Sequence, residues 1–367
     1  MIRVLHAADL HLDSPFQALS REKAAMRRSE QREILSRIAA LAMEREADMV
    51  LLAGDLFDAD SPYSETARLL EQVLPGMGVP VFIAPGNHDW YGPRSPWTRL
   101  ELGENVHVFD SGEIQCVDLP GLNARVWGAA FTGKHRNPPL TGFEAEKDGD
   151  TMDIMVLHGE VGNPASPYGA ISEEDIARSG MDYIALGHQH TFSGLLRAGE
   201  TFYAWPGCPE GRGFDETGEK GVILADIGPD GCRAEFIPLN GRRYEVLDVD
   251  LTDSADHAQT VLDALGRDTS RDVYRICLTG EPEALPDVQR LQSALEGRFF
   301  ALQLRDETRL RRDIWEGREI LSLRGLFLSK LWQRYEAAET DEERAAIELA
   351  ARYGLSALEN GEEPPVA

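Results

Sequence analysis

Five groups of polar side chains in the first half of the chain have types and spacings that suit divalent-metal chemistry. They combine carboxylates, imidazoles and an amide, and five of the nine histidines of the sequence belong to them. In chain order, the groups are Asp9 with His11, Asp55 with Asp58, Asn87 with His88, His158 alone, and His188 with His190. Mixed oxygen and nitrogen donors favour first-row ions such as Mn, Fe or Zn, whereas all-thiolate sites would indicate structural zinc or iron–sulfur clusters.

Each group directly follows a predicted buried strand. The apolar run 79–84, for example, stops at Pro85-Gly86, and the turn delivers Asn87, His88 and Asp89 together. In an open α/β sheet, ligands bind beyond the carboxyl ends of the strands, so we expect the five groups to meet. A single histidine after a strand is usually structural, but five such strand ends favour one shared site.

The number of candidate ligands predicts two ions. Seven ligands are too many for one ion and suit two ions that share a carboxylate: Asp9, His11, Asp55, Asn87, His158, His188 and His190. Only two of them carry negative charge, so two divalent ions would leave an excess of positive charge that attracts a phosphate monoester or diester. Two metals about 3.5–4 Å apart can activate a bridging water and stabilise the attacking and leaving oxygens.

The surrounding pattern predicts the elements that position these residues. Strands at 2–8, 48–53 and 79–84 alternate with helices at 17–46 and from Ser61 to Leu74, which indicates an α/β class with a helix-covered sheet. Residues 105–131 have the pattern of antiparallel strands. After residue 240, strands at 244–251, 273–278 and 299–304 with helices at 254–265 and 285–295 indicate a small α/β unit. Two helices and an unstructured end from Gly361 are expected beyond residue 313.

Composition restricts the class of protein and raises one objection to nucleic-acid binding. The chain has 367 residues, a formal net charge of −26 and a pI near 4.7. No run of about 18 apolar residues is present and the N-terminus lacks a signal-peptide layout, so we expect no membrane association. The four scattered cysteines predict reduced thiols and a cytoplasmic protein. A charge of −26 repels nucleic acid unless a basic patch or bound metal overrides it.

The motifs resemble those of a known family. D-x-H, GDLFD, GNHD, HG and GHQH, in that order over residues 9–190, are similar to the signature blocks of the calcineurin-like metallophosphoesterases. The opening HAADLHLDSPF and the block WPGCPEGRGFDETGEKGV at 205–222 resemble the SbcD-like DNA-repair exonuclease branch, particularly its YhaO-like bacterial members. The resemblance implies a four-layer α-β-β-α sandwich at 1–240, an α/β capping domain at 241–312 and a helical, partner-docking tail at 313–367.

The resemblance also implies a role for each site residue. One ion would be held by Asp9, His11 and His190, and the other by Asn87, His158 and His188. Asp55 would bridge the two ions. His88 would protonate or stabilise the leaving oxygen, and Asp58 would orient the His88 imidazole.

Three nearby acids need separate treatment. Asp13 and Asp89 are expected to be turn or supporting acids rather than ligands. Asp58 stands where archaeal and eukaryotic relatives tend to carry a histidine, so any role of that histidine does not transfer to this chain.

The function implied is a manganese-dependent (or iron- or zinc-dependent) phosphodiesterase that acts on DNA as an exonuclease, with endonuclease activity left open. A metallophosphatase or cyclic-nucleotide phosphodiesterase with the same centre is the alternative that the acidic charge favours and the 205–222 block opposes. An inactive binding module is disfavoured, since no ligand position is lost. A structural role in a larger ATPase assembly is compatible with activity. The implied partners are DNA, an SMC-like coiled-coil ATPase and a second copy of the chain.

Two stretches near the end of the chain are candidate interaction surfaces. Arg309, Arg311 and Arg312 lie in a locally basic segment that is either a DNA contact or an ordinary solvated face. The helix predicted from Glu316 to Ala337 is apolar around more than half of its circumference, which exceeds the single stripe that packing on one domain requires. We therefore expect residues 316–353 to bind a partner ATPase or a second copy, the alternative being that they pack on the catalytic domain.

Overall fold

The computed structural model describes residues 1–58, 62–266, 268–310 and 314–360, and these residues form two compact units. The first unit comprises Met1–Leu247, Gly266–Arg275 and Gly297–Gln303. The second comprises the described residues of Asp248–Leu265, Ile276–Glu296 and Leu304–Ala367. The domain boundaries expected at residues 240 and 312 remain predictions.

One six-stranded sheet of the first unit has the order β14-β13-β1-β2-β3-β4. Its strands are β1 (Ile2–Ala7), β2 (Met49–Leu52), β3 (Val81–Ile83), β4 (Val106–Val108), β13 (Gly221–Gly228) and β14 (Gly231–Pro238). Strands β1 to β4 are parallel, while β13 and β14 are antiparallel. The antiparallel strand expected at residue 106 is therefore wrong: β4 continues the parallel sheet next to β3.

A second six-stranded sheet has the order β11-β12-β10-β7-β6-β5. Its strands are β5 (Gln115–Leu119), β6 (Ala124–Gly128), β7 (Met152–His158), β10 (Tyr183–Gly187), β11 (Leu196–Ala198) and β12 (Thr201–Ala204). The central strands are parallel, and β5 and β11 are antiparallel edges, as expected for residues 115–128. A short parallel pair, β8 (Glu160–Val161) and β9 (Ala170–Ile171), follows β7.

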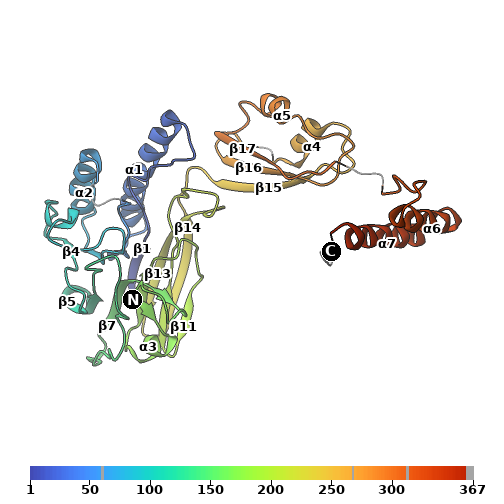
Figure 1. Cartoon of the computed structure of the whole chain (residues 1–367). Coiled ribbons are helices and arrows are strands. Elements are labelled where there is room, and N and C mark those ends of the chain that lie inside the picture. Colours follow the sequence, from blue (N-terminus) through green and yellow to red (C-terminus); the bar gives the residue numbers. More distant parts are fainter. Residues whose placement is uncertain (59–61, 267, 311–313, 361–367) are drawn as a thin grey trace. The chain divides into compact units, whose positions relative to one another are not determined.

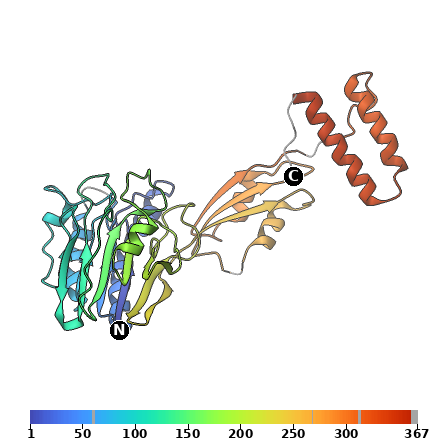
Figure 2. The same cartoon turned by 90° about the horizontal axis from the view of Figure 1, so that it is seen from below.

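The alternation of side chains along the strands builds the layers. In β2, Val50 and Leu52 pack toward the helices, whereas Met49 and Leu51 pack toward the second sheet. Helices α1 (Arg21–Glu44) and α2 (Ser64–Gly76) cover the outer face of the first sheet (Figure 1). Helix α3 (Glu173–Arg178) covers the outer face of the second. The mixed α/β class is thus confirmed, with two apposed sheets (Figure 2) and helices outside them. Two 3-10 turns, η1 (Pro96–Thr98) and η2 (Pro120–Leu122), complete this unit.

The residues after 240 form the small α/β arrangement that the pattern predicts. A three-stranded sheet has the order β15-β16-β17. Its elements are β15 (Tyr244–Asp250), α4 (His257–Ala264), β16 (Val273–Thr279), α5 (Val288–Ala294) and β17 (Ala301–Asp306).

Two C-terminal helices, α6 (Leu323–Ala337) and α7 (Asp341–Asn360), pack on each other around Trp315, Leu328 and Ala351. The helix expected from Glu316 begins instead at Leu323, because Ser322 caps it by accepting from the Gly325 amide and Gly317 has a φ of +82°. Among the described helices, none has the length and apolar character needed to cross a membrane.

Candidate metal centre

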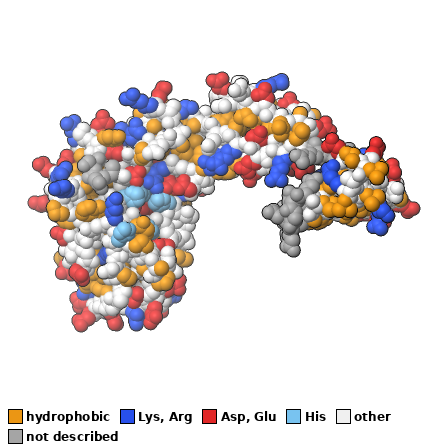
Figure 3. Space-filling view, in the orientation of Figure 1, with side chains coloured by type: hydrophobic (Ala, Val, Ile, Leu, Met, Phe, Trp, Pro, Cys, Tyr) orange, Lys and Arg blue, Asp and Glu red, His pale blue; other side chains and the backbone are white. Residues whose placement is uncertain are grey.

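The predicted ligands follow five parallel strands of the two sheets. Asp9 and His11 follow β1, Asp55 follows β2, Asn87 follows β3, His158 ends β7, and His188 and His190 follow β10. Histidine side chains reach one face of this unit in neighbouring patches, next to charged groups of both signs (Figure 3). The structure therefore brings together all seven candidate ligands that the sequence separates by up to 181 positions (9 to 190).

Unusual backbone conformations aim these side chains. Asp9, His11, Asp55 and His188 have φ values of 54°, 43°, 52° and 102°, a region that residues with a side chain rarely adopt. Backbone bonds between the loops hold this geometry, since the Asp9 amide donates to Gly54 O and the His11 amide to Asp55 O. Strained backbone that the surrounding structure holds in place is concentrated at functional sites.

The first group of ligands, here called site A, consists of Asp9, His11 and His190. His11 Nε2 and His190 Nε2 lie 3.3 Å apart. Asp9 Oδ1 lies 3.9 Å from His190 Nε2, and its two carboxylate oxygens accept from the His188 amide at 3.1 Å.

The second group, here called site B, consists of Asn87, His158 and His188. Asn87 Oδ1 lies 3.0 Å from His158 Nε2 and 3.3 Å from His188 Nδ1. The same two ring nitrogens lie 3.3 Å from each other. One amide oxygen and two imidazole nitrogens thus converge on one point.

Asp55 faces both sites with one oxygen. Its Oδ2 lies 3.4 Å from His158 Nε2 of site B and 3.7 Å from His11 Nε2 of site A. Its Oδ1 is occupied, because it accepts a hydrogen bond from the His88 amide at 2.9 Å. A single buried oxygen is therefore available to both sites.

The spacing and tautomers of these groups fit divalent ions. Two ligands bound at about 2.0–2.2 Å to one ion lie roughly 3.0–3.5 Å apart at ordinary angles, close to most of the separations above. His158 Nδ1 contacts the carbonyl of Ala53 at 2.9 Å, which can only accept, so Nδ1 carries the hydrogen and Nε2 offers a lone pair. His190 and His11 make the equivalent contacts to the Glu216 and Asp58 carboxylates.

Burial and close contact also shift the pKa values of the acids and histidines at the centre. Burial raises the pKa of Asp9 to about 6 and that of Asp89 to about 7. Burial opposes the charged form of His158, yet the Asp55 and Asp9 carboxylates raise its pKa to about 9. A cation bound at His158 Nε2 would have to displace a proton, so metal binding should be weaker at low pH.

His88 and Asp58 lie beside site A rather than within it. His88 is the most exposed residue of the group, with 45% of its side chain accessible, and its Nδ1 lies 3.2 Å from Asp58 Oδ1. That hydrogen bond raises the pKa of His88 against the opposing effect of burial. The same Asp58 oxygen lies 3.2 Å from His11 Nδ1. Asp58 therefore contacts a candidate ligand as well as His88, which the sequence did not reveal.

The sequence also assigned no role to Arg212 and Glu216. Glu216 Oε1 accepts from His190 Nδ1 at 2.7 Å and pairs with Arg212, which also lies 3.7 Å from Asp58. Burial opposes its charge, but the hydrogen bonds from His190 and Arg212 hold the pKa of Glu216 well below its usual range. Both residues belong to the 205–222 block. The sequence therefore marked this segment as a motif but did not reveal its contact with His190.

Asp13 and Asp89 act on the loops, as expected. Asp89 is buried and accepts from the amides of Asp55, Leu56 and Gly86, which fastens the loop after β2 to the loop after β3. Asp13 accepts from the Tyr63 amide and the Thr66 hydroxyl at the start of α2.

Comparison with known proteins identifies the family. The sequence model described as calcineurin-like phosphoesterase matches residues 2–192. The chain is 31% identical over 262 residues to an uncharacterized metallophosphoesterase, YhaO of Bacillus subtilis. The aligned region covers 68% of this chain and 63% of YhaO. The chain thus spans less than two thirds of that relative.

Two further relatives are more distant. The DNA double-strand break repair protein Mre11 of Saccharolobus solfataricus is 22% identical over 77% of this chain and 76% of its own length. A component of the nuclease SbcCD of Staphylococcus epidermidis is 24% identical over 69% of this chain and 74% of its own. Because the family match covers more than half of the sequence and includes all five strand-end groups, the chain belongs to the calcineurin-like phosphoesterase family.

Proposed function

We propose that the chain is a two-metal phosphodiesterase that hydrolyses DNA as an exonuclease in DNA repair, with endonuclease activity as a second mode to be tested. The observation that carries the proposal is the position of Asp55 Oδ2, which lies 3.4 Å from a site B nitrogen and 3.7 Å from a site A nitrogen. A carboxylate oxygen placed between the two sites suits a pair of neighbouring ions, of which site A and site B would hold one each.

Two divalent ions, when bound, would lower the pKa of an attacking water and stabilise charge on the attacking and leaving oxygens. Carboxylate, amide and imidazole donors suit manganese, with iron or zinc as alternatives. The Asp55 and Asp9 carboxylates would hold these cations in a buried setting, where both side chains are at most 2% exposed.

His88 is the residue that we assign to the leaving oxygen. Its hydrogen bond to Asp58 fixes the ring through Nδ1 and raises the pKa of His88, which favours the imidazolium. The imidazolium can then donate a proton from Nε2 as the phosphorus–oxygen bond breaks. Its partial exposure leaves room for a leaving group at that position.

Local positive charge beside His88 supports a polyanionic substrate in spite of the net charge of −26. A cavity of about 380 Å³ is lined by two arginines and one buried carboxylate, together with uncharged residues and His88: His88, Asp89, Trp90, Arg94, Ser95, Pro96 and Arg99. Among the described residues, no carboxylate lies within 4.0 Å of the Arg94 or Arg99 guanidinium. The names of the Mre11 and SbcCD relatives point to DNA as that polyanion. Of the basic segment considered earlier, Arg311 and Arg312 lie outside the described residues.

The alternative is a metallophosphatase or a cyclic-nucleotide phosphodiesterase with the same centre, which the acidic charge favours. The test is a panel of linear duplex DNA, single-stranded DNA, cyclic nucleotides and 4-nitrophenyl phosphates, each with and without Mn²⁺. We expect DNA cleavage that requires metal and is lost in Asp55→Asn. Hydrolysis of cyclic nucleotides or monoesters with no cleavage of DNA would establish the alternative.

For partners, we propose that α6 and α7 bind an SMC-like ATPase or a second copy of the chain, and that the protein works in the cytoplasm as a homodimer. The two helices bury part of their apolar surface against each other. Yet Ile320 and Leu321, just before α6, and Leu323 and Leu326, within it, remain 63%, 107%, 72% and 60% exposed. Such patches usually mark partner surfaces. The four free cysteines agree with a reducing compartment.

Deleting residues 313–367 tests this docking role. We expect the truncated protein to stay folded and active as a nuclease. It should have the molar mass of a single chain in solution, or it should no longer bind the ATPase. Leu321→Glu with Leu323→Glu should have the same effect on association, whereas Leu285→Glu, at a residue that is 56% exposed elsewhere, should not. A truncated chain that is unfolded or inactive would mean that the helices belong to the catalytic core.

A further inference from the structure

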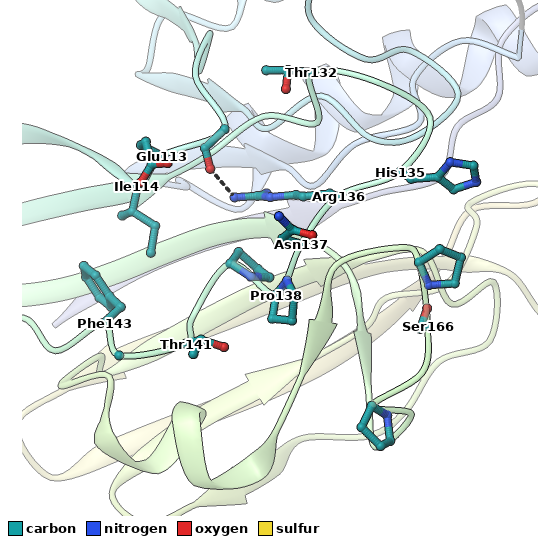
Figure 4. Close-up of a pocket in the computed structure, with 15 residues that line it drawn as sticks. Glu113, Ile114, Thr132, His135, Arg136, Asn137, Pro138, Thr141, Phe143 and Ser166 are labelled. Atoms are coloured by element: carbon teal, nitrogen blue, oxygen red, sulfur yellow. Dashed lines mark hydrogen bonds between the residues drawn. The ribbon is translucent and has the colours of Figure 1, made fainter.

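A cavity of about 790 Å³ in the first unit is not accounted for by the metal ligands (Figure 4). Its walls come from the turn at 112–114 and from the loops at 132–143 and 164–167. Hydrogen-bonding side chains line it together with the apolar Ile114, Phe143 and several prolines. The polar and charged ones are Glu113, Thr132, His135, Arg136, Asn137, Thr141 and Ser166. Cavities that bind small organic ligands have about this volume and this mixture of apolar walls and a few polar groups.

The cavity is connected to the metal centre through Tyr168. The two loops are joined by a β-bridge between Arg136 and Tyr168, with the Arg136 amide donating to Pro167 O at 2.9 Å. The Tyr168 ring lies 5.7 Å from the ring of His135, which lines the cavity, and 5.2 Å from the ring of His188 in site B. One aromatic side chain therefore separates the cavity from a candidate ligand.

The cavity lining carries charges of both signs, Arg136 and Glu113. The Arg136 guanidinium donates to two backbone carbonyls, Gly112 O at 2.8 Å and Ala129 O at 3.4 Å. Among the described residues, no carboxylate lies within 4.0 Å of it. Burial lowers the pKa of Arg136 to about 10, so the group stays charged at neutral pH. Arg136 and Glu113 together let the cavity hold a ligand that has both hydrogen-bond acceptors and donors.

The cavity and His88 lie beside different sites of the metal centre. The His88 ring contacts that of His11 in site A, with centroids 4.9 Å apart, whereas Tyr168 contacts site B. A phosphodiester carries two ester groups, so when one leaves beside His88 the retained one can extend past site B toward Tyr168. In a nucleic acid, that group is a nucleoside with a flat apolar base and hydrogen-bonding edges.

We propose that this cavity receives the nucleoside that stays attached to the cleaved phosphate. The inference rests on the proposed phosphodiesterase function and extends it by naming a substrate subsite. Asn137, whose amide can donate and accept, is placed to bind a base or sugar edge, and the apolar walls would contact the base faces.

Thr141→Trp tests the subsite, because Thr141 is exposed at the cavity wall and an indole there would fill the space. The probes are thymidine 5′-(4-nitrophenyl phosphate), its 3′ isomer and bis(4-nitrophenyl) phosphate, which has no nucleoside. We expect kcat/KM to fall by at least about tenfold for one or both thymidine esters and to stay within about twofold for the bis ester. Asn137→Ala should give the same selectivity with a loss of about two- to tenfold, as one lost hydrogen bond costs.

Glu144→Trp is the matched control, since it adds the same indole three positions further along the chain, outside the cavity lining. It should leave all three rates unchanged. If Thr141→Trp lowers the rates for the three probes equally, or lowers none of them, the subsite assignment is overturned. The proposed function has a separate failure: wild-type protein that cleaves no DNA in the presence of metal. Wild-type cleavage of DNA together with an inert Thr141→Trp would remove the subsite alone.

Discussion

The two candidate ion sites are built from similar ligands but are supported in different ways. In site A, side-chain carboxylates hold the second ring nitrogens, Glu216 for His190 and Asp58 for His11. In site B, a backbone carbonyl, Ala53 O, holds His158. His158 is fully buried, whereas 29% of the His190 side chain is exposed.

This difference indicates in which of the two sites a substitution can change the basicity of a ligand. A carboxylate partner raises the basicity of its histidine and can be altered by one substitution, while a backbone carbonyl cannot. The support of site A also reaches His88 and Arg212 through Asp58. We therefore expect site A to be the adjustable half of the centre, coupled to the leaving group, and site B to be the fixed half.

The largest expected effect is the loss of site A and site B together. In Asp55→Asn, the oxygen that faces both sites loses its charge, so we expect both ions or nearly all activity to be lost. Metal content by mass spectrometry and a DNA cleavage assay measure the two outcomes. Two ions per chain in this variant would show that Asp55 does not bridge.

Substitution of His88 should leave both sites occupied. His88→Ala removes the proton donor without removing a ligand, so turnover should fall by about 10²–10⁴ while two ions remain bound. Asp58→Asn offers a contrast, because Asp58 contacts both His88 and His11: we expect slower turnover and also weaker binding in site A. Metal loss in His88→Ala would make His88 a ligand.

Glu216→Gln should separate the two sites most cleanly. It keeps the shape of the side chain but removes the charge that His190 Nδ1 contacts at 2.7 Å, so affinity in site A should fall by about 10–100-fold. Titration with Mn²⁺ followed by calorimetry should show one weakened and one unchanged step. Two equally weakened steps would refute the separate support of the sites.

The convergence of the seven candidate ligands could be predicted from the sequence, because each of them follows a strand and parallel strands place their ends together. The supporting contacts could not, because they depend on how distant loops fold back. Glu216 reaches His190 across 26 positions only after the 205–220 loop returns to the site. Likewise, the apolar pattern predicted a helix from Glu316, but the capping contact of Ser322 places the start of α6 at Leu323.

The smallest expected effect concerns how the strand leading to site B is fastened. His6 in β1 is fully buried; its Nε2 lies 3.1 Å from Leu186 O and its Nδ1 lies 3.0 Å from the Tyr183 hydroxyl. Since a carbonyl only accepts, Nε2–H donates to Leu186 and Nδ1 accepts from Tyr183. This neutral ring therefore ties β1 of the first sheet to β10 of the second, two residues before His188.

Acid should weaken this tie in a predictable pH window. Burial lowers the pKa of His6 from 6.5 to about 3, so below pH 6.5 the unfolded chain binds a proton that the folded chain excludes. The free energy of unfolding should then fall by about 1.4 kcal/mol per pH unit between roughly pH 6 and pH 3 from this group alone. His6→Gln can make both hydrogen bonds without titrating, so its stability should depend less steeply on pH. Urea unfolding of both proteins from pH 7 to pH 5 measures the two slopes, and equal slopes would contradict a neutral His6.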